Sequence, residues 1–150
     1  MNTPNHLAVP RTDLCAFCKY LSGARPFTII ERGNLVAILV TREQRGAGHV
    51  LVAPLAHRET ILDLRKDEAA AIMAGISRVA RAIDGAFEQP GLSVWQNNGV
   101  PAGQTVPHVH FHVAGSRGYG ETERGEVPEL SVEATDEIGA RLRSRLSPPS

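Results

Sequence analysis

The sequence predicts a single globular domain that contains both β-strands and amphipathic helices. The chain has 150 residues, which is enough for one domain with a sizeable core. Two patterns predict the mixture of elements: several short β-rich runs, and one long stretch whose apolar residues recur at helical spacing. A hydrophobic content of 42% beside 21% charged residues is typical of a globular fold.

The charge balance argues against several kinds of partner. Sixteen basic and sixteen acidic side chains give a formal net charge of zero, which disfavours binding of nucleic acids or membrane surfaces through charge. The longest apolar run, residues 35–40, is far too short to cross a bilayer. Residues 1–5 lack the basic and apolar regions of a signal peptide. We therefore expect a cytoplasmic protein.

Four strands can be placed from runs rich in β-branched and other apolar residues. Residues 27–31 and 35–40 are predicted to form an antiparallel hairpin through a short turn that contains Gly33. Residues 49–53 are expected to form a third strand, and residues 92–97 a fourth.

The longest predicted helix covers about residues 67–88. Its apolar side chains recur every three or four residues and form one stripe: Ala69, Ile72, Met73, Ile76, Val79, Ala80, Ile83 and Phe87. Met73 is therefore expected in the core. Arg78 lies off the stripe and is expected on a solvated face.

The two ends of the chain differ in composition from its middle. Residues 1–13 carry two prolines and no periodicity, which predicts a loosely ordered arm. Residues 116–128 are glycine-rich and charged, which predicts a flexible loop. Residues 132–146 again show apolar positions at helical spacing, so a second amphipathic helix is expected to pack on the domain or on a partner subunit.

Three histidines at alternate positions dominate the segment 107–114. His108, His110 and His112 are separated by apolar residues. On a strand, the imidazoles would share one face and the apolar side chains would enter the core, whereas a helix would scatter them around its axis. Three neutral imidazoles close together suit a metal or a reacting centre.

Cys15 and Cys18 form a Cys-x-x-Cys pair, and the chain has no other cysteine. In a reducing compartment this pair indicates a metal site or a redox pair. A redox pair would follow a strand, and no strand pattern precedes Cys15, so zinc is favoured. Zinc would need two further ligands, for which histidines later in the chain are candidates.

A glycine-rich polar loop leads into the histidine segment. Residues 98–106 contain Gly99 and Gly103, and glycine allows a ligand to approach the backbone closely. Successive backbone N–H groups in such a loop can hold an anion. The Asn98-Gly99 pair is equally typical of a hairpin turn.

Together these motifs resemble the histidine triad (HIT) family of nucleotide hydrolases and transferases. Residues 108–114 match its His-φ-His-φ-His-φ-φ signature, where φ is a hydrophobic residue. Supporting motifs occur in the family's order: the cysteine pair, 48–54 with His57, 96–99 and 102–106. The resemblance covers residues 14–115, and the cysteine pair is similar to that of the zinc-containing, HINT-like branch.

The resemblance implies an α+β fold with a five-stranded antiparallel sheet and one long helix. It divides the chain into a flexible N-terminal arm (1–13), a HIT domain (14–115) and a C-terminal extension (116–150) with its amphipathic helix. It also implies a homodimer.

The resemblance implies a reaction at the α-phosphate of a nucleotide derivative, such as a phosphoramidate or a dinucleoside polyphosphate. His110 would be the nucleophile and form a nucleotidyl-histidine, His112 would contact the phosphate, and His49 would support them. A neutral imidazole is a competent nucleophile near pH 7. The oxygens of a reacting phosphate need hydrogen-bond donors. Neutral groups would supply them here, from Asn97, Gly103, Gln104 and Thr105.

The resemblance also implies a structural zinc ion. Its four ligands would be Cys15, Cys18, His57 and His108. A closed four-ligand site has no open position for water, so the metal would fix the histidine segment without taking part in the reaction.

One position departs from the family pattern. Many nucleoside-binding members carry an acidic residue that binds the ribose hydroxyls, and Thr41 stands there in this chain. A hydroxyl can make one such hydrogen bond, whereas a carboxylate can make two. This keeps open a second hypothesis, a zinc-stapled nucleotide-binding regulatory module with little turnover. A third, more distant hypothesis has all three motif histidines on one catalytic metal.

Overall fold

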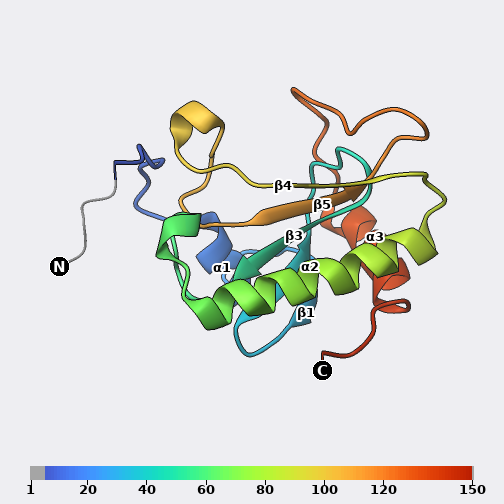
Figure 1. Ribbon diagram of the computed structural model, residues 1–150, viewed down its shortest axis with the longest axis horizontal. Coiled ribbons are helices and arrows are strands. Elements are labelled where there is room, and N and C mark those ends of the chain that lie inside the picture. The colour runs from blue at the N-terminus through green and yellow to red at the C-terminus, as the bar shows by residue number, and fades with distance from the viewer. Residues whose placement is uncertain (1–5, 150) are drawn as a thin grey trace.

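The computed structural model describes residues 6–149, and it confirms the α+β fold. A five-stranded antiparallel sheet has the order β1-β2-β3-β5-β4, and the long helix α2 lies across one face (Figure 1). The strands are β1 (Ile29–Arg32), β2 (Val36–Val40), β3 (Ala47–Pro54), β4 (Leu92–Trp95) and β5 (Phe111–Gly115). The helices are α1 (Ala16–Ser22), α2 (Lys66–Ala86) and α3 (Val132–Arg143), with 3₁₀ turns η1 (Ile61–Asp63) and η2 (Val100–Ala102).

The central strands β2 and β3 are covered on both faces, which is why they are continuous apolar runs without polar alternation. One face packs against α2 and α3 through Ile38, Val40, Val50, Val52 and Val113. The other face packs against the short helix α1 through Ala37, Leu39, Leu51 and Ala53. The sheet therefore separates a large core from a smaller one, and His110 and His112 lie on the smaller side.

A bulge near the start of β3 sets the direction of the residues that follow it. The register between β3 and β5 shifts between Ala47 and Val50. Gly48 within the bulge has a φ of 61°, and a Cβ atom there would lie 2.8 Å from the ring of Phe87. Only glycine fits this position, which explains the glycine directly before His49.

Helix α2 corrects two expectations from the sequence. Met73 is 61% exposed because the buried stripe runs through Ile72 and Ile76, and a neighbour of Ile72 is rotated by about 100° around the helix. Arg78 is not on a solvated face. Its guanidinium donates two hydrogen bonds to the carboxylate of Glu31, at 2.7 and 2.6 Å, and both side chains are largely buried.

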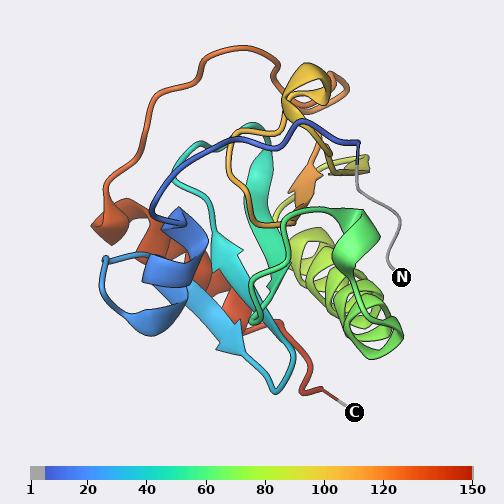
Figure 2. The same cartoon turned by 90° about the vertical axis from the view of Figure 1, so that its left-hand side faces the viewer.

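The C-terminal helix α3 packs on its own domain. Leu142 is fully buried in the large core, and a Cβ atom at Gly139 would lie 2.9 Å from Ile30. Figure 2 shows the segment between β5 and α3 arching from one side of the sheet to the other. The backbone of this segment pairs with that of the loop after β2 through an isolated antiparallel β-bridge between Glu43 and Glu129.

Helix α1 was not predicted as an element. It has seven residues, which is too short for an apolar stripe to repeat. Its N-cap is Cys15, whose sulfur accepts a hydrogen bond from the backbone N–H of Cys18 at 3.4 Å. Before it, the arm contacts η2, where the N–H of Val100 donates to the carbonyl of Ala8 at 2.7 Å. Residues 1–5 of the predicted arm lie outside the described residues.

In the described part of the chain, no helix combines the length and the apolar character that crossing a membrane requires.

Candidate active site and metal centre

The histidine segment is only partly a strand. His112 lies in β5, opposite Leu51 of β3 and Trp95 of β4. His108 and His110 precede the strand, which corrects the prediction of a strand through the whole motif. Here the backbone bonds to loops, since the N–H of Val109 donates to the carbonyl of Arg58 at 2.7 Å.

The alternation expected of the segment is nevertheless present around it. Val109 and Val113 are fully buried, and Phe111 packs against the large core. His112 and His49 lie on the opposite face, with their rings centred 5.2 Å apart. The extended backbone before β5 therefore keeps the period of two that the sequence predicted.

Hydrogen bonds from the backbone fix the tautomer of His49. The backbone N–H of Arg45 donates to Nδ1 of His49 at 3.1 Å, so this nitrogen carries a lone pair. A neutral His49 must then carry its proton on Nε2, which lies 3.0 Å from Nδ1 of His112. His49 donates to His112, and the proton of neutral His112 is on its Nε2. That nitrogen is a hydrogen-bond donor.

His110 has the opposite tautomer. Its Nδ1 lies 2.8 Å from the carbonyl oxygen of His108, which can only accept, so Nδ1 carries the proton. The lone pair of His110 is therefore on Nε2. Its ring stacks on Phe17 at a centroid distance of 4.7 Å and meets that of His112 edge-on at 5.0 Å. Two neighbouring rings thus offer one nucleophilic nitrogen and one N–H donor.

Burial keeps these imidazoles neutral. It lowers the pKa of His49 to about 3, and the nearby cation of Arg45 adds to the effect. Burial also lowers the pKa of His112 to about 2, with further contributions from His110, His49 and Arg45. The pKa of His110 is lowered by burial as well. All three rings are therefore uncharged at neutral pH.

The low pKa values of His49 and His112 predict a loss of stability in acid. In the unfolded chain histidine has a pKa near 6.5, so below about pH 6.5 the unfolded state binds protons that the folded state does not. Between pH 7 and pH 5 the free energy of unfolding should fall by about 2 kcal/mol for each of the two residues. Urea unfolding across this range measures the change. The variant H49Q/H112Q should lose the part of this dependence that these two residues contribute, about 4 kcal/mol in all, and an unchanged dependence would contradict the assignment.

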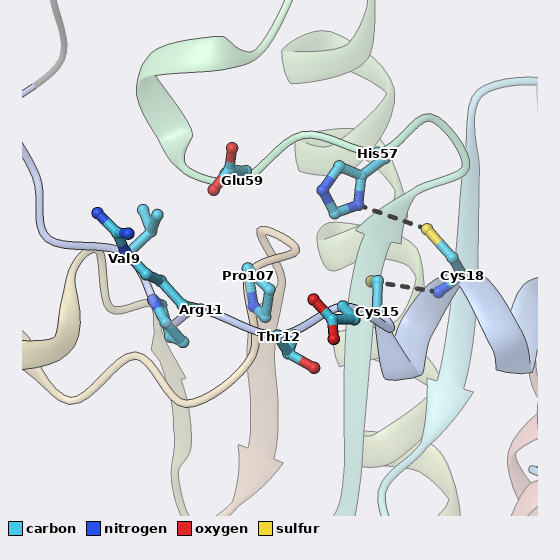
Figure 3. A pocket seen from close by; sticks show the side chains of 10 residues that line it. Val9, Arg11, Thr12, Cys15, Cys18, His57, Glu59 and Pro107 are labelled. Carbon is cyan, nitrogen blue, oxygen red and sulfur yellow. Dashed lines mark hydrogen bonds between the residues drawn. The ribbon is translucent and has the colours of Figure 1, made fainter.

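Four predicted metal ligands converge at one point beside α1. Cys15, Cys18, His57 and His108 each offer an atom, and these atoms lie within 4.8 Å of one another. Figure 3 shows His57 turned toward Cys18, with Nδ1 to Sγ at 3.4 Å. Nδ1 of His108 lies 3.4 Å from Sγ of Cys15 and 3.7 Å from Sγ of Cys18.

This donor set fits zinc. Tetrahedral coordination with zinc–sulfur and zinc–nitrogen bonds of about 2.3 and 2.0 Å requires sulfur–nitrogen distances of about 3.5 Å, close to the three that are found. Nε2 of His108 lies 2.9 Å from the carbonyl oxygen of Pro54, which fixes its proton there and leaves the lone pair of Nδ1 facing the sulfurs. The ligands come from α1 and its N-cap, from the loop after β3, and from the segment before β5. His110 and His112 belong to no such cluster among residues 6–149.

The predicted substrate-binding residues lie in more than one setting. Thr105 and Thr41 line a cavity of about 190 Å³ together with His110 and His112. Gly103 has a φ of 95°, and a Cβ atom there would lie 2.9 Å from the amide nitrogen of Asn97, so these two groups are close neighbours.

Gln104 is buried, and its amide is fully engaged within the loop. Its oxygen accepts from the N–H of Gly99 at 2.7 Å, and its nitrogen donates to the carbonyls of Glu59 and Val106 at 2.7 and 2.9 Å. Contact between this side chain and a substrate would require these bonds to be exchanged.

Three residues of the site had not been assigned to it from the sequence. Arg45 orients His49 through a backbone N–H, which no residue pattern reveals. Phe17 stacks on His110, and its place between the two cysteines is the signal that could have found it. Trp95 stacks on His112 with an interplanar angle of 3° and a centroid distance of 4.7 Å.

The sheet and the histidine segment together match one known family. A family model described as HIT domain covers residues 23–119. The chain belongs to the HIT family. A HIT-like protein from Bartonella henselae has the same fold, with a TM-score of 0.82 at 24% identity over 91% of this chain and 98% of that chain. A zinc-bound histidine triad family protein from Mycobacterium smegmatis has a TM-score of 0.75 at 28% identity, over 87% of this chain and 91% of that chain.

Other HIT relatives carry names that state an activity. The adenosine 5′-monophosphoramidase of Schizosaccharomyces pombe is 32% identical over 66% of this chain and 71% of its own length. The bis(5′-nucleosyl)-tetraphosphatase (asymmetrical) of the same organism is 33% identical over 65% of this chain and 52% of its own length. These names support a hydrolase in general for this HIT protein.

Proposed function

We propose that this HIT protein hydrolyses a nucleotide derivative at its α-phosphate through a covalent nucleotidyl-His110. The observation that carries the proposal is the opposite tautomers of His110 and His112. They put a lone pair and an N–H donor on the Nε2 atoms of two adjacent rings that line one cavity. A phosphoryl group needs both a nucleophile at phosphorus and donors at its oxygens.

The reaction would run in two displacements. Nε2 of His110 attacks phosphorus, and the bond to the leaving nitrogen or oxygen breaks with its electron pair, which takes up a proton. The N–H of His112 donates to a phosphoryl oxygen, and Asn97, Thr105 and the backbone of Gly103 assist. Water then attacks the same phosphorus and releases a proton to the solvent, while the nitrogen–phosphorus bond breaks and its electron pair returns to Nε2 of His110. Gln104 would act by holding the loop.

The metal centre would hold the histidine segment in position without taking part in the reaction. Zinc, when bound, would supply a rigid crosslink between Cys15, Cys18, His57 and His108 without an open coordination position. The carbonyl oxygen of His108 accepts a hydrogen bond from Nδ1–H of His110. A fixed His108 would therefore also orient the nucleophile.

Intact-protein mass spectrometry tests the proposal. The wild type and His110→Ala are incubated briefly with adenosine 5′-phosphoramidate and quenched in alkali, because phosphohistidine-type bonds are labile in acid. We expect a nucleotidyl adduct on the wild type alone, together with release of the mononucleotide. Neither adduct nor mononucleotide from the wild type would favour the alternative, a zinc-stapled binding module, which Thr41 supports because it replaces the family's acidic residue.

We further propose that the protein acts in the cytoplasm as a homodimer. Leu92 and Val94 on the edge strand β4 are 43% and 52% exposed. Val94 pairs with Val113, whose side chain faces the large core, so it lies on the same side of the sheet as α2 with its exposed Met73. The substitution Val94→Lys should convert a dimer into a monomer in sedimentation analysis. A monomeric wild type would contradict the proposal, and Val100→Lys on the exposed turn η2 is a control for added charge.

A further inference from the structure

The cavity beside His110 and His112 includes one residue of the C-terminal extension. Glu129 lines it together with Thr41, the position at which the family pattern has an acid. Glu129 is 88 residues away from Thr41 in sequence, so no local pattern connects them. The structure therefore brings a carboxylate from the extension to the same cavity as the histidine pair.

Backbone hydrogen bonds hold this part of the extension in place. The N–H of Leu130 donates to the carbonyl of Arg42 at 2.8 Å, and Nε of Arg42 donates to the carbonyl of Leu130 at 2.6 Å. The backbone of Glu129 itself forms an isolated antiparallel β-bridge with that of Glu43. The position of the Glu129 backbone is thus set by the loop that follows Thr41.

The carboxylate of Glu129 is available to a ligand. Its ion pair with Arg42 is long, at 3.7 Å, and its side chain is 61% exposed, so this contact contributes little to stability. The other carboxylate at the cavity, that of Glu43, lies 3.5 Å from Arg45, whose guanidinium also donates to the backbone carbonyl of Gly125. Glu129 is therefore the less constrained of the two.

Glu129 lines both the histidine cavity and a second cavity that no histidine lines. This second cavity, of about 640 Å³, adjoins the first and shares with it Tyr20, Phe27, Arg42 and Glu129, but no histidine. The shared residues lie where the two cavities adjoin, and only the first of these cavities is lined by histidines. Tyr20 and Phe27 stack there at a centroid distance of 4.1 Å and form an aromatic wall suited to a planar base. A substrate with its phosphorus at His110 would thus present its nucleoside part to Glu129.

A carboxylate at this place selects for hydrogen-bond donors. It can only accept hydrogen bonds, and it would repel another anionic group of the substrate. A pair of neighbouring hydroxyls can donate to its two oxygens, which a single threonine hydroxyl cannot match. We propose that Glu129 of the C-terminal extension binds the ribose 2′- and 3′-hydroxyls of the substrate, in place of the acid that Thr41 replaces. This inference rests on the proposed nucleotide hydrolase activity.

The test compares Glu129→Gln with the wild type on adenosine 5′-phosphoramidate and on its 2′,3′-dideoxy analogue. We expect the substitution to raise KM for the ribonucleotide about tenfold to a hundredfold, as for loss of charge-assisted hydrogen bonds, with kcat within about twofold. The dideoxy compound should show a comparable rise in KM with the wild type. Glu129→Gln should add nothing further to it, because both changes remove the same contact.

Two matched variants complete the experiment. Glu133→Gln removes the same charge from the second cavity alone and should leave both KM values unchanged. Glu43→Gln tests the competing carboxylate, and a ribose-dependent effect there and not at Glu129 would overturn the assignment. So would an equal loss with both compounds in Glu129→Gln, which would indicate contact with the base. If the wild type hydrolyses neither compound, the proposed activity itself fails, whereas turnover without an effect at Glu129 overturns this inference alone.

Discussion

Replacement of His110 by alanine should lower kcat for a nucleoside phosphoramidate by about 10⁴-fold or more, as expected when a covalent nucleophile is removed. The reason is specific to this ring. Its Nδ1 is committed to the carbonyl of His108, and Nε2 is then left with the lone pair beside the N–H of His112. Neither His49 nor His112 has a free lone pair that could replace it, because the lone pairs of both are engaged by N–H donors.

Steady-state release of the mononucleotide measures this effect. His6→Ala is a suitable control because His6 is exposed and distant in sequence from the site. The zinc content and thermal unfolding temperature of His110→Ala should be recorded, because the ring also stacks on Phe17. Turnover that survives in a folded, metal-loaded His110→Ala protein would exclude the covalent mechanism.

Removal of the metal, or the double substitution Cys15→Ser/Cys18→Ser, should have the largest effect on stability. The cluster joins α1, the loop after β3 and the segment before β5, which are far apart in sequence. A ligand present at 1,000 times its dissociation constant stabilises the folded state by about 4 kcal/mol. The loss should be of this order and smaller than the total for a zinc-finger peptide, because this domain retains its two hydrophobic cores.

Metal analysis and urea unfolding, with and without a chelator, measure the effect. The chelated wild type should recover both stability and turnover when zinc is returned, whereas the double variant should recover neither. Turnover should fall with the metal because His108 is both a proposed metal ligand and the hydrogen-bond acceptor for Nδ1 of His110. A protein purified without metal, whose unfolding a chelator does not change, would contradict the assignment.

Part of this fold could be predicted from the sequence because it depends on short-range periodicity. The continuous apolar runs of β2 and β3 reflect burial on both faces, and the stripe through Ile72 and Ile76 reflects the one face of α2 that packs on the sheet. The spacing of the three histidines also predicted their arrangement, since residues two apart in an extended chain lie on the same face. Each of these signals involves residues within a few positions of one another.

Features that depend on long-range pairing were not predictable. Arg78 is buried because Glu31, 47 residues earlier, provides its partner. His108 leaves the strand because Val109 bonds to the loop at Arg58. The tautomer of His49 follows from the backbone N–H of Arg45, which every residue except proline possesses. Helix α1 is too short to repeat a pattern, so its place is set by packing of Phe17 and Leu21 on the sheet.

The stacking of Trp95 on His112 has an optical consequence. Trp95 is the only tryptophan in the chain, so the entire indole emission originates from a ring whose centroid lies 4.7 Å from that of His112. An imidazolium ring quenches indole fluorescence by accepting an electron from the excited state, whereas a neutral imidazole does so weakly. The unmodified protein therefore carries a built-in reporter, and its indole emission should stay unquenched for as long as His112 is neutral, without any added label.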